Sequence, residues 1–138
     1  MSLFAIDAIQ EVIALLRADE AVAGLTSTVA ANLAPQGSQM PYLVVSLASD
    51  QAQHTLCRDV AVGFAYVSVR AVAATVGEAK ALADAACAAL SGQEVEGADG
   101  TRFGVSYRSA FSYPDPARSG GAPSMNVGAV FQISYQPA

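Results

Sequence analysis

The stretch Ala34-Pro35-Gln36-Gly37-Ser38-Gln39-Met40-Pro41-Tyr42-Leu43-Val44-Val45-Ser46 decides the fold class, because it joins a connector to a strand. Proline and glycine punctuate its first half, whereas its second half is rich in aliphatic and aromatic residues. A second strand is predicted around Tyr66–Val72, and Thr75-Val76-Gly77-Glu78 has the pattern of a helix-capping box. The order connector, strand, strand, helix predicts an α+β fold.

The segments outside this stretch extend the same pattern. Ser2 can cap an amphipathic helix that is predicted to run to about Ala18, because apolar residues recur at spacings of three and four from Ile6 to Leu16. A short helical turn follows over residues 19–23, and residues 25–40 are predicted as connector. The capped second helix is expected to end at Ser91-Gly92, a C-terminal glycine signal.

Four strands are expected over residues 42–49, 59–72, 101–112 and 125–136, with polar or Pro/Gly-rich loops over 50–58 and 113–124. In the third strand the alternation predicts that Phe103, Val105, Tyr107 and Phe111 face the core, and that Arg102, Ser106, Arg108 and Ser112 face out. The predicted fold is therefore an antiparallel β-sheet of about four strands with two helices packed on one face. Residues 1–138 are expected to form a single domain.

Composition excludes several classes of protein. The formal net charge is −5, which argues against a dedicated nucleic-acid binder. No apolar run is long enough to span a bilayer, and the N-terminus lacks the basic region of a signal peptide. We therefore expect no membrane partner and synthesis in a reducing cytoplasm. Mean hydropathy is high at +0.37, which favours burial of the excess apolar surface against other subunits. The alternative is that the many alanines reflect a GC-rich genome.

No catalytic, metal or cofactor motif is found. His54 is the one histidine, so a nucleophile–base pair would have to use it, with Cys57 nearby on the predicted loop. Cys57 and Cys87 lack metal-ligand spacing, and Gly120-Gly121 lies between two predicted strands rather than before a helix. We expect a protein that is not an enzyme and that has no cofactor, no metal and no catalytic residues.

The order and spacing of these elements resemble one family, the tail-completion or tail-terminator proteins of long-tailed bacteriophages. The resemblance rests on Pro41-Tyr42 opening the first strand, Val67-Ser68-Val69, the helix Ala79-x-x-Leu82-Ala83-Asp84 and the closing alternating strand. It covers most of the chain. One departure lies in the connector, where Val29-Ala30-Ala31-Asn32-Leu33 lacks an aromatic–proline pair expected there.

This resemblance implies a structural virion protein that forms a hexameric ring at the head-proximal end of the tail tube. Such a ring ends tube polymerisation and joins the tail to the neck at the tail–neck junction, after assembly in the cytoplasm of the host bacterium. The implied partners are further copies of the chain, the tail tube protein and a head-completion or neck protein, with DNA passing through the lumen. Relatives occur in gene transfer agents. The alternatives are another head–tail connector, such as a stopper or adaptor, and a small-ligand-binding α+β domain.

The charge distribution suggests how such a ring would close. A ring needs two different patches on each subunit. We hypothesise that Arg70, Arg102 and Arg108 of one subunit meet acidic residues near the helices of the next, drawn from Glu78, Asp84, Glu94 and Glu96. A solvated polar face is the alternative reading. The predicted partner-docking loops contain Gln53, His54, Arg58, Tyr113, Asp115 and Arg118.

Overall fold

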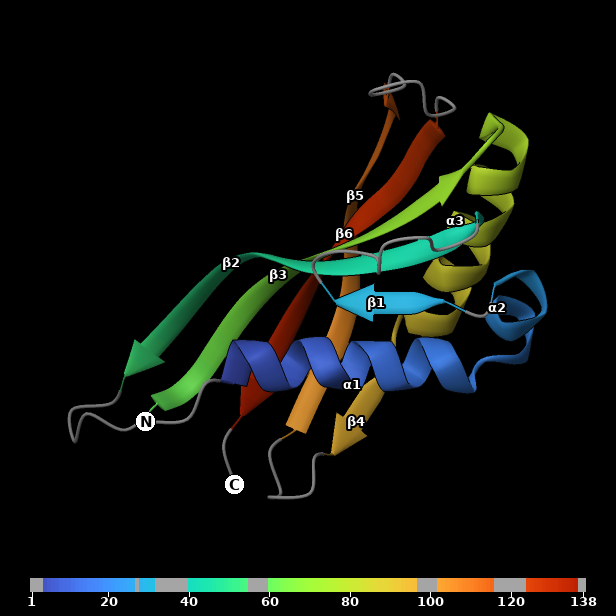
Figure 1. Cartoon of the computed structure of the whole chain (residues 1–138). Helices are drawn as coiled ribbons and strands as arrows, with labels where there is room; N and C mark the ends of the chain where they lie inside the picture. Colours follow the sequence, from blue (N-terminus) through green and yellow to red (C-terminus); the bar gives the residue numbers. More distant parts are fainter. Residues whose placement is uncertain are drawn as a thin grey trace.

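The computed structural model describes residues 4–26, 28–31, 40–54, 60–96, 102–115 and 124–136 (Figure 1). Within these residues the helices are α1 (Phe4–Ala18), α2 (Glu20–Leu25) and α3 (Val76–Leu90). The strands are β1 (Val29–Ala31), β2 (Tyr42–His54), β3 (Val60–Ala73), β4 (Glu94–Glu96), β5 (Arg102–Asp115) and β6 (Ser124–Gln136). The prediction of an α+β fold is confirmed.

The strands form one sheet in the order β1-β2-β3-β6-β5-β4. β1 runs parallel to β2, and every other neighbouring pair is antiparallel, so the sheet is mixed. The expected sheet of about four antiparallel strands therefore corresponds to the four long strands. Sequence reasoning missed β1 and β4 because strands of three residues are too short to show a periodicity.

β1 lies inside the segment predicted as connector. It is held by the Leu43 amide, which donates to the Thr28 carbonyl oxygen over 3.0 Å, and by register pairing with Leu43–Val45. From α1, the Arg17 Nη2 atom donates to the Val29 carbonyl oxygen over 2.9 Å. Tertiary contacts thus make a strand from a segment with little intrinsic preference for one.

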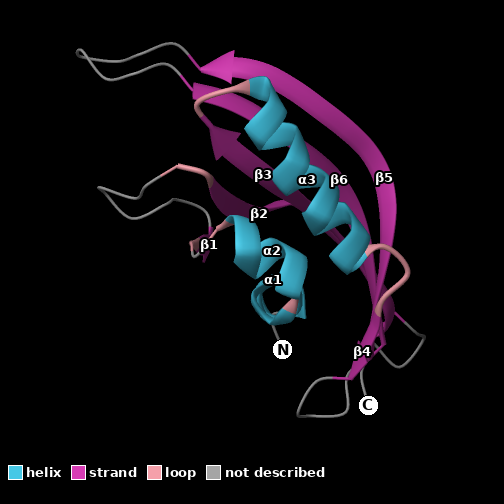
Figure 2. Ribbon diagram, turned by 90° about the vertical axis from the view of Figure 1, so that its right-hand side faces the viewer, coloured by secondary structure: helices cyan, strands magenta, loops and turns pink. Residues whose placement is uncertain are grey.

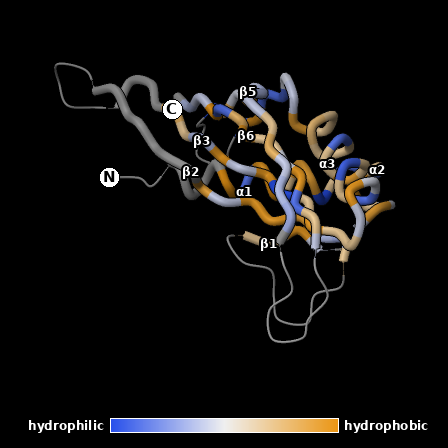
Figure 3. The backbone as a smooth tube through the Cα atoms, turned by 90° about the horizontal axis from the view of Figure 1, so that it is seen from above, coloured by the Kyte–Doolittle hydropathy of each residue, from blue (hydrophilic) through white to orange (hydrophobic). Residues whose placement is uncertain are grey.

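The helices cover one face of the sheet, and the sheet curls over them (Figure 2). The buried core lies between them and includes Leu16 of α1, Leu82 of α3, Val67 of β3 and Phe131 of β6. Hydrophobic segments accordingly gather around α1 and the central strands (Figure 3). The opposite side of the sheet is called here the helix-free face. Two helices were expected, and the third, α2, was predicted only as a turn.

The structure confirms the first of the two hydrogen bonds of the capping box predicted at the start of α3. The Thr75 hydroxyl accepts from the Glu78 amide over 3.3 Å. The helix ends where the Ser91 amide donates to the Cys87 carbonyl oxygen, and Gly92 follows with φ of +74°, a left-handed conformation that glycine adopts without steric cost. The predicted apolar stripe is also confirmed, since Ala79, Leu82, Ala83, Ala86 and Leu90 are all buried.

β2 is longer than predicted and corrects the assignment of residues 50–58 to a loop. The strand continues to His54 because β3 lies opposite and supplies ladder partners, from Asp50 opposite Ala65 to His54 opposite Val60. Hydrogen bonding to a neighbouring strand has overridden the weak strand preference of this polar segment. Residues 55–59 lie outside the described part of the chain.

A β-bulge in β5 corrects the predicted facing of Phe111 and Ser112. Tyr107 lies opposite Phe131 and Ser109 opposite Val130, so Arg108 is the extra residue. One extra residue exchanges the two faces of the strand beyond it. Phe111 therefore lies opposite Gly128 on the helix-free face, and Ser112 lies opposite Val127, which packs against the core.

β5 also runs further than predicted, to Asp115, so Tyr113 and Pro114 are strand residues rather than loop residues. Pro114 lies opposite Met125 of β6, and no described strand pairs with its other side. Proline is tolerated where a strand has a free side, because its missing N–H then breaks no ladder hydrogen bond. The predicted loop residues 116–123 lie outside the described part.

Candidate assembly interface

Arg70 is the central charged residue of the helix-free face. Its neighbours Val69 and Ala71 belong to the core, so the half-buried Arg70 side chain projects from the opposite face of β3. The Arg70 Nη1 atom donates a hydrogen bond of 2.9 Å to the hydroxyl of Tyr113 on β5. Within the described residues no carboxylate forms an ion pair with Arg70. The ion pair found in these residues joins Lys80 and Asp84 of α3.

The ring of Phe111 stacks on Tyr113, with centroids 6.0 Å apart and planes at 24°. Gly128 of β6 lies opposite Arg70 of β3 on one side and opposite Phe111 of β5 on the other. A Cβ atom on Gly128 would collide with the Val69 carbonyl oxygen and lie 2.7 Å from Phe111 Cζ. The glycine therefore lets an aromatic ring and a guanidinium from two different strands lie over the same strand.

The other two predicted arginines lie elsewhere on the sheet. Arg102 is exposed at the start of β5, opposite Gln136, whereas Arg70 lies opposite Gly128. Arg102 is thus at the end of β6, whereas Arg70 lies against its first half. Arg108 is the exposed bulge residue of β5. The three guanidinium groups are therefore spread along the sheet, and within the described residues Arg70 is the one of the three that donates to another side chain, the Tyr113 hydroxyl.

The predicted acidic residues fall into two groups. Glu78 and Asp84 are exposed on α3, and Asp84 accepts from Lys80 Nζ over 2.7 Å. Glu94 and Glu96 are exposed on β4, at one edge of the sheet, where Glu96 lies directly opposite Arg102 of the same chain. The two glutamates of β4 thus lie near Arg102 of the same chain, whereas Glu78 and Asp84 lie on the helix layer.

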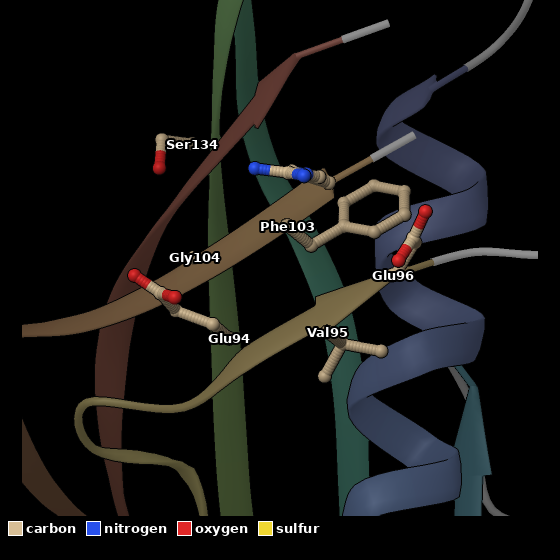
Figure 4. Close-up of a pocket in the computed structure, with 7 residues that line it drawn as sticks. Glu94, Val95, Glu96, Phe103, Gly104 and Ser134 are labelled. Carbon is tan, nitrogen blue, oxygen red and sulfur yellow. The ribbon is translucent and has the colours of Figure 1, made fainter. Parts of the chain in front are cut away.

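β4 and β5 border an open groove of about 440 Å³ (Figure 4). Its lining combines two carboxylates with one guanidinium and an aromatic ring: Glu94, Val95, Glu96, Arg102, Phe103, Gly104 and Ser134. Phe103 is buried and contributes to the lining of the groove, whereas both glutamates are exposed. Mixed charges on an exposed rim are typical of a polar contact surface rather than of a closed ligand pocket.

The predicted docking residues are only partly described. Gln53 and His54 lie at the end of β2, and Asp115 lies at the end of β5, where the backbone alone is described. Tyr113 is described fully and is engaged by Arg70. Arg58 and Arg118 lie outside the described residues.

Two titratable groups of α3 are perturbed. Burial, and then the negative charge of Asp84, raise the pKa of the Cys87 thiol. The hydrogen bond from Lys80 to Asp84 raises the pKa of Lys80. Both shifts favour the ordinary protonated forms, so neither creates a nucleophile.

The described residues contain no cluster of three or more histidine, cysteine, aspartate or glutamate side chains that could hold a metal ion. None of the described helices is long and apolar enough to cross a membrane.

Sequence reasoning missed the contact between Arg70 and Tyr113. The two residues are 43 positions apart, and the bulge at Arg108 decides which face carries Tyr113. A bulge has no reliable signature in a single sequence. The sequence prediction placed Phe111 in the core and Tyr113 in the following loop, so it brought neither residue to the helix-free face.

A family model described as "Tail completion protein gp17" matches residues 10–122. The chain belongs to the tail completion protein gp17 family. As a family member it is a structural protein of phage-type tails and a virion component. The resemblance inferred from the sequence is therefore confirmed.

A solved structure described as "Virion of native gene transfer agent (GTA) particle" contains a similar chain. The TM-score is 0.61 and the identity 22%, over 91% of this chain and 91% of that one. At this identity the likeness shows a shared fold. No curated protein matches the chain.

Proposed function

We propose that this tail completion protein is a tail terminator, which forms a ring on the head-proximal end of the tail tube, stops tube polymerisation and joins the tail to the neck. The observation that carries the proposal is the family match over residues 10–122, which spans α3 and the five strands from β1 to β5. Membership in a structural virion family also favours a role without catalysis.

The charge distribution supports a head-to-tail contact between subunits. Such a contact joins two different surfaces of the same chain, and repetition closes a ring. The exposed carboxylates of α3 lie on the helix layer, whereas Arg70 projects from the helix-free face. We assign Glu78 and Asp84 to one side of the contact and the three arginines to the other, as the sequence suggested. Glu94 and Glu96 remain candidates beside Arg102.

The two ends of the sheet are the proposed docking regions for the tail tube and the neck. The hairpin of β2 and β3 extends away from β1 at one end, and the hairpin of β5 and β6 ends near residues 115 and 124 (Figure 1). The ends of hairpins lie away from the core, so a partner can bind there without disturbing it. A ring with docking regions at both ends could join two different partners.

A different neck protein, such as a stopper or adaptor, is the second candidate, because it would share the ring architecture and differ only in its partner. A small-ligand-binding domain is less well supported, since the groove between β4 and β5 is open and rimmed by exposed carboxylates. Binding to tail tubes in preference to capsid portals separates the first two candidates.

Light scattering at several protein concentrations, with and without purified tail tubes, tests the proposal. A ring in solution, or a monomer that becomes a ring on tubes, is the expected result. Electron microscopy of the tubes should then show the protein at one end only, and tubes incubated with it should stop growing. A monomer that ignores tubes would overturn the proposal.

A further inference from the structure

A row of four side chains crosses the sheet on its helix-covered face. Leu47 of β2 lies opposite Val67 of β3, Val67 opposite Phe131 of β6, and Phe131 opposite Tyr107 of β5. Val67 and Phe131 are almost completely buried, at 0% and 1% exposure. Leu47 and Tyr107 are 38% and 50% exposed. The row therefore ends at each side of the sheet on a large apolar side chain that the subunit does not cover.

Both ends of the row lie on strand edges without a described neighbour. Among the described residues, β1 pairs with Leu43–Val45, so that no described strand lies along this edge of β2 over residues 46–54. On the other side, β4 pairs with Arg102–Gly104 and the Gln93 carbonyl oxygen accepts from the Val105 amide. In the part of the chain that the structure describes, no strand lies along this edge of β5 over residues 106–115. Open edges carry unpaired N–H and C=O groups that can pair with another chain.

Both edge strands also bend beside the row. The register shifts after Leu47 in β2 and after Tyr107 in β5, so that each strand has a bulge next to its exposed row residue. Bulges bend a strand and increase its twist. A bulge on one edge alone would discourage pairing with another strand. Here both edge strands bend next to the same row of side chains, so the edge of β2 and the edge of β5 can have the same curvature.

We propose that the open edge of β2 in one subunit lies beside the open edge of β5 in the next subunit, with Leu47 in contact with Tyr107. This inference rests on the proposed ring. The subunit contact that it names differs from the pairing of Arg70 with the carboxylates of α3, because a sheet that continues across the interface keeps the helix layers of both subunits on one side. The occupant of each edge is a second copy of this chain, because the two exposed ends belong to the same buried row and their joining continues that row across the interface. The contact is head-to-tail, as a closed ring requires.

Strand direction agrees with this arrangement. β2, β3, β6 and β5 are successively antiparallel, so β2 and β5 point in opposite directions within one subunit. Subunits of a ring share one orientation relative to its axis, so β2 of one copy meets β5 of the next antiparallel. The edge-to-edge contact thus extends the antiparallel order of the sheet.

Cysteine cross-linking tests the contact directly. The variant carries Leu47→Cys and Tyr107→Cys in a chain whose natural thiols are removed by Cys57→Ser and Cys87→Ala. Paired strand positions bring Cβ atoms within reach of a disulfide or a short bismaleimide. After assembly, alone or on tail tubes, the double variant should give a ladder of covalent oligomers up to the ring. Either single-cysteine variant should give no ladder, and an equal mixture of the two should stop at dimers.

The matched control replaces Leu47→Cys by Leu25→Cys, because Leu25 has a similar exposure of 43% but lies on α2. Rings that form without a ladder, or a ladder equally strong in this control, would overturn the edge contact and leave the terminator proposal standing. If the cysteine-free parent forms no ring either alone or on tubes, both proposals are wrong.

Discussion

The Arg70 guanidinium reaches across β6 to donate a hydrogen bond of 2.9 Å to the Tyr113 hydroxyl, joining two strands that are not neighbours. The bond crosses the sheet near Gly128, which lies opposite Arg70 on one side and opposite Phe111 on the other. A residue without a side chain at this position leaves room for the contact. The missing Cβ atom of Gly128 therefore allows the side chains of Arg70, Phe111 and Tyr113 to lie close together on the helix-free face.

Gly128→Ala should destabilise the protein, because the new methyl group would collide with the Val69 carbonyl oxygen and press on Phe111. Overpacking of this kind costs about 1–3 kcal/mol. Chemical denaturation of the two proteins measures the difference in free energy of unfolding. The control is Gly77→Ala in α3, where a Cβ atom meets nothing within 4 Å and alanine should stabilise the helix slightly. Equal stability of Gly128→Ala and the parent would contradict the packing described.

Tyr113→Phe should lower stability by less than about 1 kcal/mol, because the lost hydrogen bond is exposed to solvent. A double-mutant cycle with Arg70→Gln isolates the coupling between the two side chains. A coupling energy indistinguishable from zero would mean that the contact does not hold Arg70 in place. Arg70→Glu should, in addition, weaken ring assembly beyond its effect on folding.

Cys87 should react slowly with thiol reagents at neutral pH, since burial and Asp84 both raise its pKa. In a Cys57→Ser background, Asp84→Asn should speed the reaction, whereas Glu78→Gln, on the first turn of the same helix, should not. Alkylation rates followed by mass spectrometry give the comparison. An unchanged rate in Asp84→Asn would show that burial alone sets the thiol pKa.

The same shift gives stability a defined pH dependence. Because the folded-state pKa of Cys87 is raised, the unfolded chain ionises first as pH rises, which favours unfolding. The stabilising contribution of the protonated thiol is therefore present below the ordinary thiol pKa and is lost as pH rises through the folded-state value. Cys87→Ala should remove this part of the alkaline decline in the denaturation midpoint.

Arg102→Glu and Arg108→Glu together should weaken ring assembly, because both residues are exposed and the proposed facing surface is acidic. Each exposed ion pair contributes roughly 0–1 kcal/mol, so the effect should be largest at low salt. Sedimentation at several salt concentrations measures it. The control reverses Glu11 and Glu20, which lie outside the proposed contact. Unaltered assembly of the arginine variant would rule out the charge pairing, and rescue by a Glu78→Lys and Asp84→Lys partner would support it.

Local patterns in the sequence determined the long elements. α1 and the core stripe of α3 follow from apolar residues at helical spacing, and the start of α3 follows from Thr75 as its cap. The alternation in β6 correctly placed Phe131 and Ile133 in the core. The resemblance built on these elements also led to the family that the match over residues 10–122 shows. These features were readable because each depends on residues within a few positions of one another.

Only the tertiary structure decided the short strands, the length of β2 and the face that carries Phe111 and Tyr113. β1 exists because β2 and Arg17 satisfy its backbone groups, and the outer half of β2 exists because β3 lies opposite. The contact of Arg70 with Tyr113 depends on the bulge at Arg108, which exchanges the faces of β5. These features depend on hydrogen bonds and register between segments far apart in the chain, and a local pattern carries no information about them.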